Sequence, residues 1–151
     1  MRKFVIVKDG TARIMEAQDS VDPLDEIKKW HPDDQAKVTS VREINESDIP
    51  VNRTVALRNA WEDDGSNITV NLSKARVNKT DEIRPERNKK LATLDVDYIR
   101  ADEAGDADKK QSIAVIKQKL RDLPETIQSE LNALDTPDAL EKFTPTWPGG
   151  E

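Results

Sequence analysis

Short apolar runs alternate with turn residues over the first part of the chain. The first run, Phe4–Val7, is β-branched and is followed by Asp9-Gly10. This dipeptide is typical of two-residue hairpin turns, because glycine accepts a positive φ without steric cost. Residues 12–15 supply an apolar return segment. The pattern therefore predicts a β-hairpin over residues 3–16.

The segments that follow predict further short elements. Asp22-Pro23 indicates a helix start, because Asp is a favourable N-cap and Pro fits the first helical position. This helix should end before His31-Pro32. A weak strand is expected over residues 38–44, and a second hairpin is expected from Arg58–Trp61 through a turn to residues 68–70. Residues 1–72 are thus predicted to form a β-rich domain of roughly four strands and one short helix.

From Ser73 onward, apolar residues recur at helical spacing. Ser73 is expected to be the N-cap of a helix over residues 73–104, which would be about 48 Å long at 1.5 Å per residue. Pro85 removes one hydrogen bond of such a helix and predicts a kink or a break near Arg84. The apolar positions that share one face are Ile83, Leu91, Leu94, Tyr98 and Ala101.

A second helix is expected over residues 107–122, ending at Pro124. Its short connection through Gly105 makes the two helices antiparallel neighbours, so we predict a helical hairpin over residues 73–123. The shorter helix would leave residues 73–90 to pack on the β-rich part or on another chain. The predicted seam places Ile113, Ile116 and Leu120 against Leu91, Leu94 and Tyr98. Opposite charges also face each other in this arrangement: Asp102 and Glu103 with Lys109 and Lys110, and Asp95 with Lys117 and Lys119.

The last segment, residues 124–151, is expected to hold short helices and a proline-rich, irregular tail. An amphipathic stretch covers residues 125–134, and Thr136-Pro137 should start a short helix that runs to Phe143. The predicted fold class is therefore α+β. A small β-rich N-terminal part (1–72) precedes an antiparallel helical hairpin (73–123) and an irregular C-terminal tail (124–151).

Composition excludes several kinds of chemistry. The net charge of -6 argues against general affinity for nucleic acid. The chain has no cysteine and a single histidine, His31, so thiolate catalysis, cysteine-bound zinc and histidine-rich metal sites are excluded. The few glycines form no phosphate-binding loop. Carboxylates alone could serve a hydrolase, but no pair stands out from the charged background. We expect no enzyme activity, no cofactor and no metal.

Two features are candidates for partner binding. Basic residues outnumber acidic ones over residues 74–90, which would suit an acidic partner, although a solvated helix face is the favoured explanation. Trp147 lies in the proline-rich tail, where it could anchor a partner or fold back onto its own chain. The acidic cluster of residues 95–108 is interpreted as a solvated hairpin tip, since it lacks calcium-loop spacing. The candidate partner-binding residues are Arg76, Lys79, Arg84, Arg87, Lys90 and Trp147.

Residues 50–124 resemble a family of small proteins encoded in the tail and tail-fibre modules of tailed bacteriophages. The resemblance rests on three segments: Arg58-Asn59-Ala60-Trp61, the run Leu94-Asp95-Val96-Asp97-Tyr98-Ile99-Arg100-Ala101, and Lys117-Gln118-Lys119-Leu120-Arg121-Asp122. The family carries corresponding R-N/D-A-W, L-D-V-x-Y-x-R-A and K-Q-x-L-R-D elements. This sequence departs from the family at Pro85 and in its first 50 residues.

The resemblance implies a non-enzymatic protein that binds a phage tail-fibre or tail protein and promotes its assembly or attachment. Such an assembly chaperone would act in the host cytoplasm, within an oligomeric assembly. Independently of the resemblance, the net charge and the absence of a long apolar run predict no contact with nucleic acid or membrane. The alternative is a permanent structural component of the virion tail, such as a tail adaptor or a fibre-base protein. The divergent first half would be the natural place for partner choice.

Overall fold

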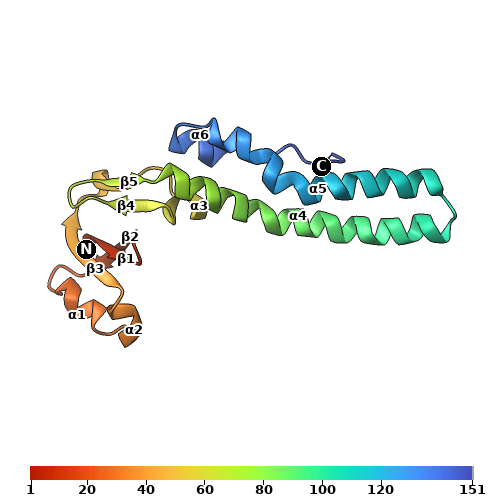
Figure 1. The fold of residues 1–151 in the computed structure, drawn as a ribbon. Helices are drawn as coiled ribbons and strands as arrows, with labels where there is room; N and C mark the ends of the chain where they lie inside the picture. Colours follow the sequence, from red (N-terminus) through yellow and green to blue (C-terminus); the bar gives the residue numbers. More distant parts are fainter. Residues whose placement is uncertain (151) are drawn as a thin grey trace. The chain divides into compact units, whose positions relative to one another are not determined.

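A computed structural model describes residues 1–150 (Figure 1). The chain is α+β, with antiparallel strands first and two long helices after them, which confirms the predicted fold class. Its contacts divide it into two compact units, the first covering Met1–Asn78 and the second beginning at Lys79. This division differs from the predicted segments 1–72, 73–123 and 124–151, because the boundary falls inside a helix.

The first unit is built on a three-stranded antiparallel sheet. Strand β1 (Arg2–Lys8) lies between β2 (Thr11–Ala17) and β3 (Val38–Ile44), in the order β2-β1-β3. The predicted hairpin is confirmed, and both of its turn residues have positive φ, 52° at Asp9 and 71° at Gly10. These two angles match the turn type whose twist fits a two-residue hairpin.

One face of this sheet forms the core of the first unit. Side chains alternate between the faces of a strand, so Val5, Ala12 and Ile44 share a face, and they pack with Trp61 and other buried residues. A second hairpin supplies part of that core through β4 (Trp61–Asp63) and β5 (Ile68–Val70). Trp61 lies in this core, with 2% of its surface exposed.

The strand predicted to begin at Arg58 is wrong in its first half. Residues Val55–Arg58 form a short helix, α3, and β4 begins only at Trp61. The helical turn places Ala56 and Leu57 in the interior, and the side-chain amide of Asn78 donates to the carbonyl of Ala56 at 2.9 Å. Contacts distant in sequence therefore decide this segment, since its four residues carry no clear periodicity of their own.

The other short elements follow their capping residues. Helix α1 (Pro23–Ile27) begins as predicted, with the Asp22 carboxylate accepting from the backbone N–H of Leu24 at 2.8 Å. Helix α2 (Pro32–Gln35) and a 3-10 turn, η1 (Glu46–Asp48), complete the connections around β3.

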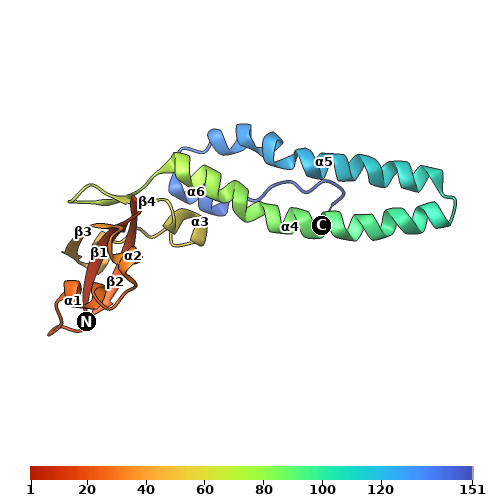
Figure 2. The ribbon, with the colours of Figure 1, turned by 60° about the horizontal axis from the view of Figure 1, so that its bottom comes forward.

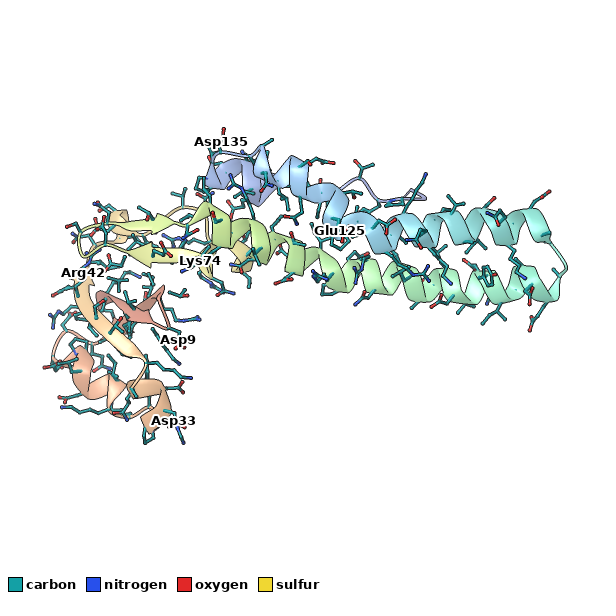
Figure 3. The ribbon with its side chains drawn as sticks, viewed as in Figure 1. Asp9, Asp33, Arg42, Lys74, Glu125 and Asp135 are labelled. Carbon is teal, nitrogen blue, oxygen red and sulfur yellow. The ribbon has the colours of Figure 1, made fainter. Side chains whose placement is uncertain are left out.

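An ion pair with a buried carboxylate joins the three-stranded sheet to the second hairpin. The guanidinium of Arg42 on β3, which is labelled in Figure 3, contacts both carboxylate oxygens of Asp63 on β4, with distances of 2.6 Å and 3.0 Å. The Asp63 side chain is only 2% exposed. The bidentate geometry compensates the loss of water around that carboxylate.

Helix α4 (Leu72–Glu103) is continuous through Pro85, so of the two predicted alternatives, a kink or a break near Arg84, the break is wrong. A proline removes a single backbone donor, and the buried residues on either side of it, Ile83 and Ala101 among them, keep the helix in place. Ser73 is not the N-cap. The side-chain oxygen of Asn71 accepts from the backbone N–H of Lys74 at 3.0 Å, so the cap lies two residues earlier.

Helix α5 (Ala107–Asn132) is also longer than predicted, because it passes through Pro124. A row of buried residues at helical spacing spans the proline and holds both halves against the rest of the unit. The short helix α6 (Pro137–Lys142) then begins as predicted, with Thr136 as its N-cap. The buried residues of α5 are Ile113, Leu120, Leu123, Ile127 and Leu131.

The extended α5 changes the packing expected for α4. The side-chain amide of Gln128 donates to the Thr80 hydroxyl at 3.0 Å, and Lys79 donates to the Glu141 carbonyl at 3.3 Å. Figure 2 shows α5 and α6 running beside α4. The second unit thus covers residues of α4 that the sequence pattern had left to another partner.

Candidate functional site

The basic residues predicted for partner binding have different surroundings. Arg76 belongs to the first unit, and the other four belong to the second. Lys79 is 8% exposed and makes an ion pair with Glu82 at 3.1 Å in addition to its bond to Glu141. Its ammonium group holds α6 against α4 and is not available to a partner.

Arg84 and Arg87 bond to neighbours on their own helix. Arg84 pairs with Asp81 at 3.0 Å, and Arg87 donates to the side-chain oxygen of Asn88 at 2.8 Å. Such contacts within one turn of an exposed helix contribute little to stability. These two arginines fit the interpretation as a solvated helix face.

Lys90 and Trp147, the remaining two candidates, are brought together. The Lys90 ammonium lies 5.1 Å from the centroid of the Trp147 ring, within the range of a cation–π contact. Trp147 is partly buried. The tail therefore folds back onto the helices, which was one of the two alternatives for this residue.

A groove of about 310 Å³ lies next to this contact, between α4, α5 and the tail. Its floor is apolar, with Leu94 on α4 and Ile116 and Leu120 on α5, and charged side chains stand at its rim. The remaining lining residues are Glu86, Lys89, Lys90, Thr93 and Pro148–Gly150. This arrangement of an apolar floor with a few polar groups is typical of binding sites.

The tail wall of the groove depends on Gly149. Its φ is 87°, and a Cβ placed on it would come within 3.0 Å of a methyl carbon of Ile116. Both the backbone conformation and the available space therefore favour glycine here. Close packing between Gly149 and Ile116 fixes the tail as one side of the groove.

The helices below the groove meet in the predicted seam. Asp95 and Lys117 are ion paired at 2.5 Å, and Lys110 pairs with Asp102 across the turn. The hydrogen bond from Lys110 to Asp102 raises the pKa of that lysine. The centroid of the Tyr98 ring lies 5.4 Å from the ammonium group of Lys110 and 5.0 Å from that of Lys117. Antiparallel packing of α4 and α5 is thereby confirmed.

The remaining candidates for chemistry are not assembled into a site. Within residues 1–150, no group of three or more His, Asp or Glu side chains is placed to hold a metal ion. His31 is exposed, and its Nδ1 accepts from the backbone N–H of Asp33 at 3.3 Å, as an N-cap does. None of the helices in this part of the chain combines the length and apolar character that a bilayer crossing requires.

The chain matches no known protein family, no curated protein and no solved structure. The groove itself was not foreseen from the sequence, because Leu94, Ile116 and Leu120 were interpreted only as seam residues. A signal was present in the glycine residues of the tail, which permit close approach of the backbone to a helix surface.

Proposed function

We propose that this chain is a non-enzymatic module that binds a bacteriophage tail-fibre or tail protein and promotes its assembly or attachment. The proposal starts from the resemblance over residues 50–124. It gains support from the contacts that two of the resembling segments make with each other in the fold.

One observation carries the proposal: two of the three segments that resemble the phage family, residues 94–101 and 117–122, build the helical hairpin. Asp95 comes from the first helical segment and Lys117 from the second, and they form an ion pair. Tyr98 packs beside Lys117, and Leu120 is fully buried. The resemblance thus includes residues that contact one another. This favours a shared structural element over a coincidental sequence similarity.

We assign partner contact to the groove beside Lys90 and Trp147. Its apolar floor can accept a few side chains of a partner, and its charged rim can orient them. A small interface of this kind suits reversible association, as an assembly factor requires.

The test is recovery of partners with the tagged full-length chain from cells that produce phage tail and fibre proteins, followed by mass spectrometry. We expect a tail or fibre protein in a defined ratio. A Thr93→Arg variant places a long charged side chain in the groove from an exposed helix position. Partner recovery should fall about tenfold or more, because the long charged side chain would occupy the space of the partner's side chains and would lose water when a partner binds.

Ile99→Arg is the matched control, since Ile99 lies on the same helix, is exposed and does not line the groove. Its partner recovery should stay near that of the parent chain. Recovery of no tail or fibre protein by a folded chain would refute the proposed function. Equal recovery by both variants would refute the groove as the contact. Stoichiometric presence in purified mature particles would identify a permanent tail component instead of a transient assembly factor.

A further inference from the structure

The outer edge of β2 carries main-chain groups that point away from the sheet. In a two-residue hairpin the pair that closes the turn, here Lys8 and Thr11, exchanges its hydrogen bonds, and bonded pairs then recur at every second residue. Arg13 and Met15 therefore bond to β1. The N–H and C=O groups of Ile14 and Glu16 point outward.

No other strand is hydrogen-bonded to this edge. β2 is the outermost strand of the sheet, and no hydrogen bond to the outward groups of Ile14 or Glu16 occurs within residues 1–150. The strand contains no proline, and its pairing with β1 runs without a bulge. The opposite edge strand, β3, has a register shift beside Val7 and Lys8. Bulges and prolines are devices that protect sheet edges, so β2 is the edge that lacks them.

A pocket of about 410 Å³ borders β2, which contributes Arg13, Ile14 and Glu16 to its lining. Ile14 and Ile49 supply apolar surface, and the buried ring of Trp61 adds to it. The polar part of the lining is strongly basic, with four cationic side chains and one carboxylate. These polar lining residues are Lys3, Arg13, Arg53, Arg58, Asn59 and Glu16.

Two of the cations in the lining have no acidic partner. Lys3 and Arg53 both pair with Glu46, at 3.1 Å and 2.9 Å. Arg13 and Arg58 make no ion pair with any residue of the described chain. An occupant of this pocket would meet unpaired positive charge, so charge complementarity calls for an acidic ligand.

We infer that β2 accepts an extended, acidic segment of a partner protein as a fourth strand of the sheet. Main-chain hydrogen bonds to Ile14 and Glu16 would hold the segment, and an acidic side chain would enter the pocket near Arg58. Strand addition of this kind derives affinity from the backbone and specificity from pockets for alternate side chains. The inference rests on the proposed function only for the identity of the protein that supplies the segment.

Amide hydrogen exchange of the isotopically labelled full-length chain tests the inference directly. The probe is an eight-residue peptide that alternates Thr and Val and carries two Glu residues. Saturating peptide should slow exchange at Ile14 and Glu16 at least tenfold. Exchange at Arg13 and Met15, which already bond to β1, should change little. The inward amides of Arg13 and Met15 alternate with the outward amides of Ile14 and Glu16 along one strand. The exchange rates of the inward pair are therefore the internal reference for those of the outward pair.

Two variants and a second peptide sharpen the test. Glu16→Pro removes an outward donor without removing a bond to β1, and should weaken peptide binding about 3- to 10-fold. Glu16→Thr keeps the N–H and is the matched control for loss of the carboxylate. A peptide with Lys in place of Glu should bind at least tenfold more weakly, because it would face the unpaired arginines.

The outcomes separate this inference from the proposed function. Equal protection at all four amides, or none with a folded chain, would overturn the added strand even if a fibre protein copurifies. Equal binding of the Lys peptide would overturn the acidic specificity. Protection of Ile14 and Glu16 in the free chain that disappears on dilution would assign the edge to a second copy of this chain and overturn a foreign partner. The peptide result does not depend on recovery of a phage protein.

Discussion

Leu120→Ala probes the seam of the helical hairpin at its best-buried point. Leu120 is fully buried on α5, and it also forms part of the groove floor. Removing three side-chain carbons here eliminates contacts with α4 while leaving the backbone of α5 intact. The substitution therefore measures how much of the second unit's stability comes from the seam.

The expected loss is about 2–4 kcal/mol in the free energy of unfolding of the second unit. Leu-to-Ala costs depend on how well the site collapses around the cavity. Leu120 borders an open groove of about 310 Å³, so water or the tail can enter the vacated space. This favours the lower half of the range. Val115→Ala, on the same helix but 44% exposed, should cost less than about 1 kcal/mol and is the control.

Urea denaturation gives the measurement, with Trp147 as the reporter of the second unit. Replacing Trp30 and Trp61 with Phe would leave Trp147 as the only tryptophan, since the chain has three. Every variant must then be made in this background, in which Trp30 and Trp61 are replaced by Phe. A loss below about 1 kcal/mol for Leu120→Ala would refute the burial argument and would mean that the face is exposed in solution.

Three further predictions concern charge and proline. Arg42→Met should lower the free energy of unfolding of the first unit by about 2–3 kcal/mol, because the Asp63 carboxylate, whose side chain is 2% exposed, loses its cation. Urea denaturation measures this, and a decrease below about 1 kcal/mol would contradict the prediction. The hydrogen bond from Lys74 holds the pKa of Glu62 below its ordinary value of 4.5, so this contribution to stability is complete above that pH and is lost as the pH falls through the folded-state pKa. The urea midpoint of the Lys74→Met variant should therefore fall less between neutral and acid pH than that of the parent chain. An equal fall in both chains would contradict the link between the Glu62 pKa and stability. Pro85→Ala restores a helical donor at an exposed position and should raise the stability of the second unit by about 1–3 kcal/mol, whereas destabilisation would indicate that the proline supports the helix.

Local chemistry made the strand hairpin and the helix starts predictable. Asp9-Gly10 defines a two-residue turn almost alone, because few other pairs accept positive φ at both positions. Asp22-Pro23 and Thr136-Pro137 each combine a capping side chain with a residue suited to the first helical turn. The α4–α5 seam followed from helical spacing on two segments joined by a short turn. In these cases, neighbours in sequence contain the deciding interactions.

Tertiary packing decided the elements that sequence reasoning missed. Pro85 and Pro124 each remove one donor, a local cost that can be outweighed by burial of residues on both sides of the proline. Helix α3 likewise depends on Asn78, which is distant in sequence and bonds to Ala56. The length of α5, and with it the covering of Thr80 by Gln128, could not be inferred from a rule that ends helices at proline.

The candidate sites were harder to predict than the fold, because they depend on which charged side chains have no ion-pair partner in the folded chain. Basic residues over 74–90 were visible as a charge run, yet Lys79 proved to be buried and Arg84 paired. Arg58 was not among the predicted partner-binding residues, although it belongs to the segment that resembles the phage family and lines the basic pocket. A sequence shows where charges are, but only the assembled structure shows which of them already have partners.

The groove and the β2 edge differ in physical kind, and this difference allows a final test. The groove recognises side chains, whereas the edge binds main chain and tolerates many sequences. If one partner engages both, the second contact forms within an existing complex, and binding depends on the two together. Thr93→Arg and Glu16→Pro should then show effects on partner affinity that deviate from additivity by more than about 0.5 kcal/mol in a double-mutant cycle. Additive effects on one recovered protein would mean that the two surfaces act independently. Loss of two different proteins, one with each variant, would mean that the chain connects two partners.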